Sequence, residues 1–143
     1  MNCQIVSRYN VVYEGPADLV LLPSVNGQLG ILRNHVRMYT KLQPGIITVR
    51  LAGEDTFYTA TGGLAEVKPD VVRILVDSSE NVDEIDVERA LEAKKRAEEA
   101  MKNAPSRNST EFMRAMMEMK KSNLRISASQ RRQMHRGTRN MQP

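Results

Sequence analysis

Hydrophobic residues from Cys3 to Asp77 fall into short runs that turn residues separate. The clearest runs are Val11–Tyr13, Leu19–Leu22, Ile46–Val49 and Val71–Val76, and the turns include Asn26-Gly27, Pro44-Gly45 and Gly62-Gly63. Short β-branched runs indicate strands, and turns this frequent leave no room for long helices. The pattern predicts an N-terminal all-β sandwich of about ten short strands.

The sequence changes character after Ser79, where Ala, Glu, Lys, Arg and Met replace Val, Ile, Thr and Gly. Asp86 is a suitable N-cap because its carboxylate can accept from free amide groups of a first helical turn. Alanines then recur with the spacing of one helical stripe, at positions 90, 93, 97, 100 and 104. Small side chains on that stripe allow a second helix to approach closely.

A second helix is predicted beyond Pro105, which ends the first one. Asn108 and Glu111 form a candidate capping box, and Phe112, Met116, Met119 and Ile126 form an apolar stripe. Two amphipathic helices with a short connection make an antiparallel αα-hairpin. We therefore expect an α+β chain with a β-sandwich domain at 1–82, a helical hairpin at 83–130 and a disordered basic tail at 131–143.

Composition narrows the class of protein. The 143 residues can bury one modest core, and no apolar run reaches the ~20 residues that a membrane-spanning helix needs. The N-terminus lacks the layout of a signal peptide, and Cys3 is the single cysteine, so we expect a cytoplasmic protein without disulfides.

The net charge of +4 is concentrated in one segment. Residues 1–79 carry seven basic and seven acidic side chains, whereas residues 114–143 carry eight basic residues and one acidic residue, Glu118. A C-terminal arm this basic predicts an acidic partner: nucleic acid, anionic lipid, bound phosphate or an acidic protein surface.

The sequence contains little that indicates a catalytic site. The two histidines, His35 and His135, stand beside no carboxylate or nucleophile in a known arrangement, and Gly27–Gly30 is too short for a phosphate loop. We therefore predict a non-catalytic protein that requires no cofactor.

Cations of the two predicted helices point to a phosphate-binding groove. Asp86, Arg89 and Arg96 share one face of the first helix, and Lys121 and Arg125 are four residues apart on the second. If the hairpin closes, four cations flank one cleft, which is an arrangement that holds a polyphosphate. The alternative interpretation is a solvated surface on which the arginines pair with Glu88 and Glu92.

A basic nucleic-acid-binding module on a β-sandwich scaffold is the main alternative function, since the C-terminal arm would attract phosphate backbones. Phe112 is the one Phe, Tyr or Trp residue after Tyr58, so stacking of bases on aromatic side chains is not expected. We therefore expect no nucleic-acid partner.

Three segments, taken in order along the chain, resemble the epsilon subunit of the F-type ATP synthase. They are Gly27-Gln28-Leu29-Gly30-Ile31-Leu32 with His35, Thr61-Gly62-Gly63-Leu64-Ala65-Glu66-Val67, and Ile85-Asp86-Val87-Glu88-Arg89-Ala90. The resemblance implies a non-catalytic central-stalk subunit of a proton-translocating enzyme, at the cytoplasmic face of the bacterial cell membrane. It also implies the gamma subunit, the c-ring and the alpha/beta catalytic subunits as partners.

The resemblance further implies two roles for the hairpin. ATP is a regulatory ligand in some members, at positions that match Glu80, Ile85, Asp86, Arg89, Arg96, Lys121 and Arg125, with lysine in place of arginine at 121. The extended hairpin inhibits ATP hydrolysis in many members. Here the inhibitory basic arm would consist of Arg114, Lys120, Lys121 and Arg125.

A c-ring contact loop is implied at Gln28, Leu29, Gly30, Ile31 and His35. The family usually has a glutamate and a Pro-Gly pair in this loop, whereas this chain has Gln28 and Arg33-Asn34. The electrostatics of the contact therefore differ from the usual pattern.

Overall fold

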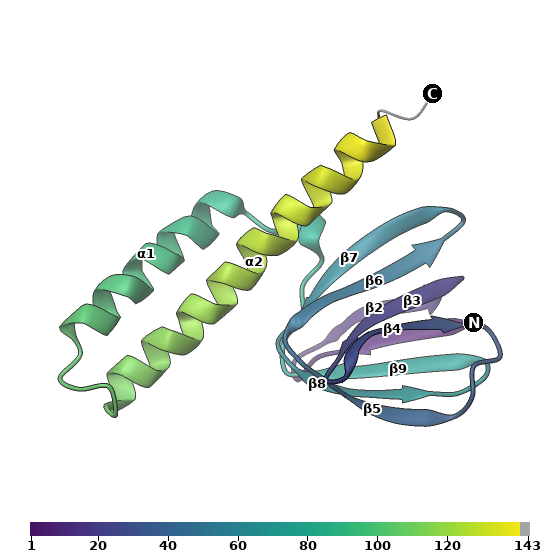
Figure 1. Cartoon of the computed structure of the whole chain (residues 1–143), viewed down its shortest axis with the longest axis horizontal. Coiled ribbons are helices and arrows are strands. Elements are labelled where there is room, and N and C mark those ends of the chain that lie inside the picture. Colours follow the sequence, from purple (N-terminus) through teal and green to yellow (C-terminus); the bar gives the residue numbers. More distant parts are fainter. Residues whose placement is uncertain (141–143) are drawn as a thin grey trace. The chain divides into compact units, whose positions relative to one another are not determined.

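The computed structural model describes the backbone of residues 1–140 and the side chains of residues 1–134. Contacts divide the chain into two compact units, Met1–Asp83 and Glu84–Pro143. The first unit contains the strands and the second contains the two long helices, so the predicted α+β class is confirmed (Figure 1).

Nine strands, where about ten were expected, form the first unit in the described residues. They are β1 (Asn2–Val6), β2 (Val11–Pro16), β3 (Leu19–Ser24), β4 (Gly27–Leu32), β5 (Met38–Leu42), β6 (Gly45–Leu51), β7 (Glu54–Ala60), β8 (Gly63–Val67) and β9 (Val71–Val76). Hydrogen bonds join them in the order β2-β1-β9-β8-β5-β3-β6-β7, and β4 pairs with β3. β1 and β9 are parallel, and the other pairs are antiparallel.

The sheet curls over itself where β3 meets β5, because these strands pair only at Ser24 and Leu42. The hydroxyls of Ser24 and Thr40 share a buried hydrogen bond of 2.8 Å at the same place. The curl brings β2, β1, β9, β8 and β5 to face β4, β3, β6 and β7 (Figure 1). The first unit is thus a sandwich closed on one side.

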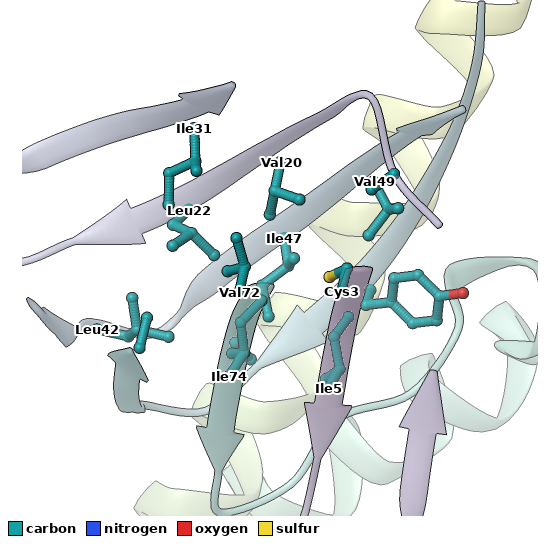
Figure 2. Packing of buried hydrophobic residues seen from close by; sticks show 14 of the residues in the cluster. Cys3, Ile5, Val20, Leu22, Ile31, Leu42, Ile47, Val49, Val72 and Ile74 are labelled. Atoms are coloured by element: carbon teal, nitrogen blue, oxygen red, sulfur yellow. The ribbon is translucent and has the colours of Figure 1, made fainter. Parts of the chain in front are cut away.

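Alternating strand residues fill the space between the two layers, as the period of a half-buried strand requires. Cys3 and Ile5 of β1 and Val72 and Ile74 of β9 are fully buried, and they face side chains from the opposite layer (Figure 2). The opposite layer contributes Val20, Leu22, Ile31, Ile47 and Val49.

β8 begins with a glycine, Gly63, for a steric reason. Its φ of 155° lies outside the range that L side chains adopt readily, and an added Cβ would overlap the backbone carbonyl of Leu75. The Gly62-Gly63 turn therefore allows β8 to lie against β9.

Helices α1 (Val87–Asn103) and α2 (Thr110–Asn140) lie side by side and antiparallel within the second unit (Figure 1). A 3-10 turn, η1 (Val82–Glu84), precedes them. The predicted N-cap of α1 is confirmed: the Asp86 carboxylate accepts from the Arg89 amide at 3.2 Å.

The start of α2 corrects one expectation. Ser109 caps the helix by accepting from the Phe112 amide at 3.2 Å, so Asn108 and Glu111 do not form the capping box. The turn after Pro105 explains the shift, because the Ser109 amide and hydroxyl both donate to the Ser106 carbonyl.

The C-terminal tail corrects another expectation. We predicted disorder from residue 131, but α2 continues to Asn140. Residues 130–134, Gln-Arg-Arg-Gln-Met, all have high helix propensity and contain no helix breaker. Residues 141–143 lie outside the described part of the chain.

Small residues form the seam between the helices. Ala90 and Ala97 of α1 are buried, as are Ala115 and Ser122 of α2, and each pair is two helical turns apart. Neither described helix is long and apolar enough to cross a lipid bilayer.

Candidate functional site

A groove runs along one side of the α1–α2 seam. Its cavity has a volume of about 360 Å³, within the usual range for ligand sites. Four alanines line it, together with Arg96 of α1 and Glu111, Arg114 and Glu118 of α2. The alanines leave the space open because they do not reach across the seam.

Charged side chains border this apolar floor. Arg96, Arg114, Glu111 and Glu118 are all exposed. None of the four forms an ion pair within 4 Å among the side chains that the structure describes. Two guanidinium groups from opposite helices can thus meet an oxyanion from both sides.

One of the four predicted phosphate-binding cations, Arg96, lines this groove, and the other three lie on the same helical rows as Arg96 and Arg114. Arg89 stands seven residues before Arg96 on α1, and Lys121 and Arg125 stand seven and eleven residues after Arg114 on α2. These intervals are sums of steps of three and four residues, so each set lies on one helical row. Arg96 alone of the four lines the groove, and Arg89, Lys121 and Arg125 are outside its lining.

The other predicted nucleotide residues have local structural roles. Ile85 is buried, and the Asp86 carboxylate caps α1. Glu80 belongs to the sandwich unit, where its amide donates to the Thr59 hydroxyl and its carbonyl accepts from the Thr59 amide.

The predicted c-ring contact loop is not a loop. Gln28, Leu29, Gly30 and Ile31 lie within β4, and His35 follows at the far end of that strand. Ile31 faces the core with no exposed surface, so it is unavailable to a partner. Gln28 is exposed near the start of β4, and the strand ends four residues later, about 13 Å along the chain, before the turn at Arg33 and Asn34.

The predicted inhibitory basic arm does not share one face. Arg114, Lys121 and Arg125 occupy one row of α2, whereas Lys120 precedes Lys121 and points about 100° away. Arg114, Lys120 and Lys121 are exposed and Arg125 is half-buried.

Glu111 and Glu118 are groove residues that sequence reasoning missed. A signal was present, because they stand three residues before and four residues after Arg114. A protein-only metal cluster is absent from the described residues, since no three His, Cys, Asp or Glu side chains gather there.

Comparison with known families covers both units. Residues 1–82 match the model of the "ATP synthase, Delta/Epsilon chain, beta-sandwich domain". Residues 83–130 match the "ATP synthase, Delta/Epsilon chain, long alpha-helix domain".

Relatives and solved structures are consistent with these matches. The ATP synthase epsilon chain of Nitrosomonas europaea is 38% identical, over 89% of this chain and 90% of that one. The epsilon chain of Prochlorococcus marinus is also 38% identical, over 90% of this chain and 97% of that one. A chain of the Euglena gracilis mitochondrial ATP synthase, solved as OSCP/F1/c-ring, shares the fold with a TM-score of 0.69 at 21% identity, covering 93% of this chain and 80% of that one.

Proposed function

This chain belongs to the ATP synthase delta/epsilon family, and we propose from this premise that its sandwich assembles the central stalk while its hairpin regulates ATP hydrolysis. It is a non-catalytic central-stalk subunit of the ATP synthase. Its partners are the gamma subunit, the c-ring and the alpha/beta catalytic subunits, and its place is peripheral, at the cytoplasmic face of the bacterial membrane.

The division into two units carries the proposal. Contacts separate residues 1–83 from the helices, and the sandwich has a continuous core of its own. The sandwich can therefore serve as an assembly platform without α2. Arg114, Lys120 and Lys121 of α2 are exposed and can meet an acidic surface of the catalytic head, with each exposed pair contributing ~0.2 to 1 kcal/mol.

The test is ATP hydrolysis by reconstituted enzyme that contains either the full chain or a chain ending at Ala104. Truncation is expected to leave assembly intact and to raise hydrolysis at low salt, and high salt is expected to shrink the difference. The joint replacement of Arg114, Lys120, Lys121 and Arg125 by alanine should act like truncation. A matched variant in which Lys94, Lys95 and Lys102 of α1 become alanine should not.

Equal hydrolysis by full-length and truncated enzyme at low salt contradicts the regulatory role of the hairpin. Loss of assembly on truncation contradicts the independent role of the sandwich. Each half of the proposal therefore has its own outcome.

The α1–α2 groove supports a second proposal: the hairpin binds ATP as a regulatory ligand. Arg96 and Arg114 line one groove from opposite helices, and Arg89, Lys121 and Arg125 lie further along the same two helical rows. Lysine offers a single charged group where arginine offers a two-pronged fork, so Lys121→Arg should tighten binding. Calorimetry on the isolated full chain measures this, and no heat at millimolar ATP would contradict the proposal.

For the c-ring contact, we propose the Gln28 end of β4. Cysteine at the exposed Gln28 should cross-link to the c-ring in the assembled enzyme, and more strongly than cysteine at the half-buried His35. Cys3 is fully buried and does not compete. Cross-linking from His35 alone would reverse this orientation.

A further inference from the structure

The first turns of α2 are rich in methionine. Met113, Met116, Met117 and Met119 are four of the nine methionines of the chain. Met113 and Met117 are 47% and 69% exposed, whereas Met116 and Met119 are half-buried. One short helical segment therefore contains two pairs of thioether groups that differ in their access to solvent.

The half-buried pair lies beside the seam between the helices. Met119 stands four residues after Ala115 and three before Ser122, so it shares a helical row with these two buried seam residues. Met116 stands three residues before Met119, next to that row. Met117 is two residues from Met119, which places it about 200° around the helix axis, on the side that faces away from α1. Packing against α1 therefore shields one pair and leaves the other open to solvent.

A hydroperoxide oxidises a thioether by transferring one oxygen atom to the sulfur. The O–O bond breaks, an S–O bond forms, and the sulfur gives up two electrons. The peroxide is reduced to water or an alcohol, which takes up the peroxide hydrogen. The product, methionine sulfoxide, is polar, so it costs free energy wherever it has to be desolvated in an apolar contact. A sulfoxide beside the seam therefore opposes packing of the helices, and one on the exposed side does not.

Other sulfur groups do not divert this chemistry from α2. Cys3 is fully buried, and burial raises the pKa of its thiol to about 12, so the reactive thiolate does not form at neutral pH. Met1 and Met38 are partly buried against the sandwich core. Among the side chains that the structure describes, the exposed methionines are Met113, Met117 and Met134, and all three belong to α2.

We propose that the methionine cluster at residues 113–119 is a peroxide-modification site that holds the hairpin open. Met116 and Met119 react when the helices separate, and their sulfoxides then oppose closure. Met113 and Met117 react in the closed hairpin and leave it closed. The modification is reversible, because methionine sulfoxide reductases restore the thioether. It goes beyond the function proposed above and does not depend on a role of the hairpin in ATP hydrolysis.

The first experiment measures oxidation site by site. The full chain is treated with hydrogen peroxide, and tandem mass spectrometry follows the sulfoxide at each methionine of residues 113–119. We expect Met119 to react at least about fivefold more slowly than Met117, because it reacts through local opening. Ala97→Leu crowds the seam, so it should speed oxidation of Met119 at least about fivefold and leave Met117 unchanged. Lys95→Leu, on the exposed side of α1, is the control and should keep the wild-type rates.

Two outcomes of this experiment overturn gating by the hairpin. One is equal rates at Met117 and Met119 in the wild type. The other is a rate at Met119 that does not respond to Ala97→Leu.

The second experiment measures the effect of oxidation on the hairpin. After prolonged peroxide treatment, the helical signal of the wild type at 222 nm should melt earlier, with the open population raised at least about fivefold. Treatment with methionine sulfoxide reductase should restore the melt. Met116→Leu with Met119→Leu keeps the apolar volume and removes the reactive sulfurs, so peroxide should not shift its melt. Met113→Leu with Met117→Leu is the matched control and should respond like the wild type.

Equal responses of the two double variants overturn the assigned role of Met116 and Met119. An oxidised wild type that melts like the reduced protein overturns the proposal as a whole, because the sulfoxides then do not oppose closure.

Discussion

The interiors of the two units of this chain contain different kinds of side chain. The sandwich buries large residues completely, among them Ile5, Leu22 and Ile74. The seam of the hairpin buries Ala90, Ala97, Ala115 and Ser122. Burial of a large aliphatic side chain contributes about 1.5 to 3 kcal/mol, far more than burial of an alanine. The sandwich is therefore expected to be the more stable unit and the hairpin the one that opens first.

This contrast suits the proposed division of function. A platform for assembly benefits from a rigid core, and regulatory elements come from the low-stability end of a structure. All four tyrosines lie in the sandwich and the chain has no tryptophan, so tyrosine fluorescence reports on the sandwich alone. Helical circular dichroism reports on the hairpin.

The largest expected effect comes from a charge in the sandwich core. Ile31→Asp should destabilise the sandwich by more than about 4 kcal/mol, because Ile31 is fully buried and has no polar partner. Leu32→Asp, at an adjacent residue that is 61% exposed, should change stability by no more than about 0.5 kcal/mol. Denaturant unfolding followed by tyrosine fluorescence measures both, and similar losses would contradict the assigned direction of β4.

A smaller effect is expected from crowding the hairpin seam. Ala97→Leu should lower hairpin stability by about 1 to 3 kcal/mol, since the two helices approach through small residues. The tyrosine transition should stay unchanged while the helical signal melts earlier. Lys95→Leu, on the exposed side of α1, is the control. Equal shifts of the tyrosine and helical signals would show that the sandwich and the hairpin unfold as one cooperative unit, and would contradict the expected difference in their stability.

Alkaline pH should act on the sandwich through Cys3. Burial raises the pKa of the Cys3 thiol to about 12, from an ordinary value of 9.0. As the pH rises, the Cys3 thiol of the unfolded chain loses its proton before that of the folded chain. The contribution of this pKa difference to the free energy of unfolding is therefore complete below pH 9 and is lost as the pH rises toward 12. The loss is about 1.4 kcal/mol per pH unit in that range. Unfolding of the wild type and of Cys3→Ala, compared from pH 8 to 11, should show a shallower decline for the variant; parallel declines would contradict the assignment.

The smallest effect concerns the start of the hairpin. Asp86→Ala should cost about 1 kcal/mol of hairpin stability by removing the cap from the Arg89 amide, and Asp86→Asn should restore most of it. Thermal melts at 222 nm measure the loss. The tyrosine signal should not respond, and a response there would extend the role of Asp86 beyond α1.

Residue patterns predicted most of the fold because the relevant forces are local. Short apolar, β-branched runs between turns predicted the strands, and the alanine spacing with Asp86 predicted α1. Local signals misplaced the start of α2, where the turn at Ser106 selects Ser109 as the cap. They also gave too little weight to helix propensity beyond residue 130.

The candidate site was predictable only in part. Helical spacing predicted that Arg89 and Arg96 would share a face, as would Lys121 and Arg125. It did not show that Glu111 and Glu118 line the same groove, because that depends on the rotation of α2 against α1. The β4 residues misled for a similar reason: the motif includes Ile31, and only the closed sandwich shows that this side chain is buried.

The sequence by itself determined the boundary between strands and helices, the class of the fold, the basic character of the C-terminal arm and the family, because each depends on composition, period or the order of motifs along the chain. Tertiary structure alone decided which layer each strand joined, how β3 and β5 close the sandwich at Ser24 and Leu42, and which charges border the groove. These features depend on residues far apart in the sequence or on how two helices are rotated about their axes. No local pattern encodes either of them.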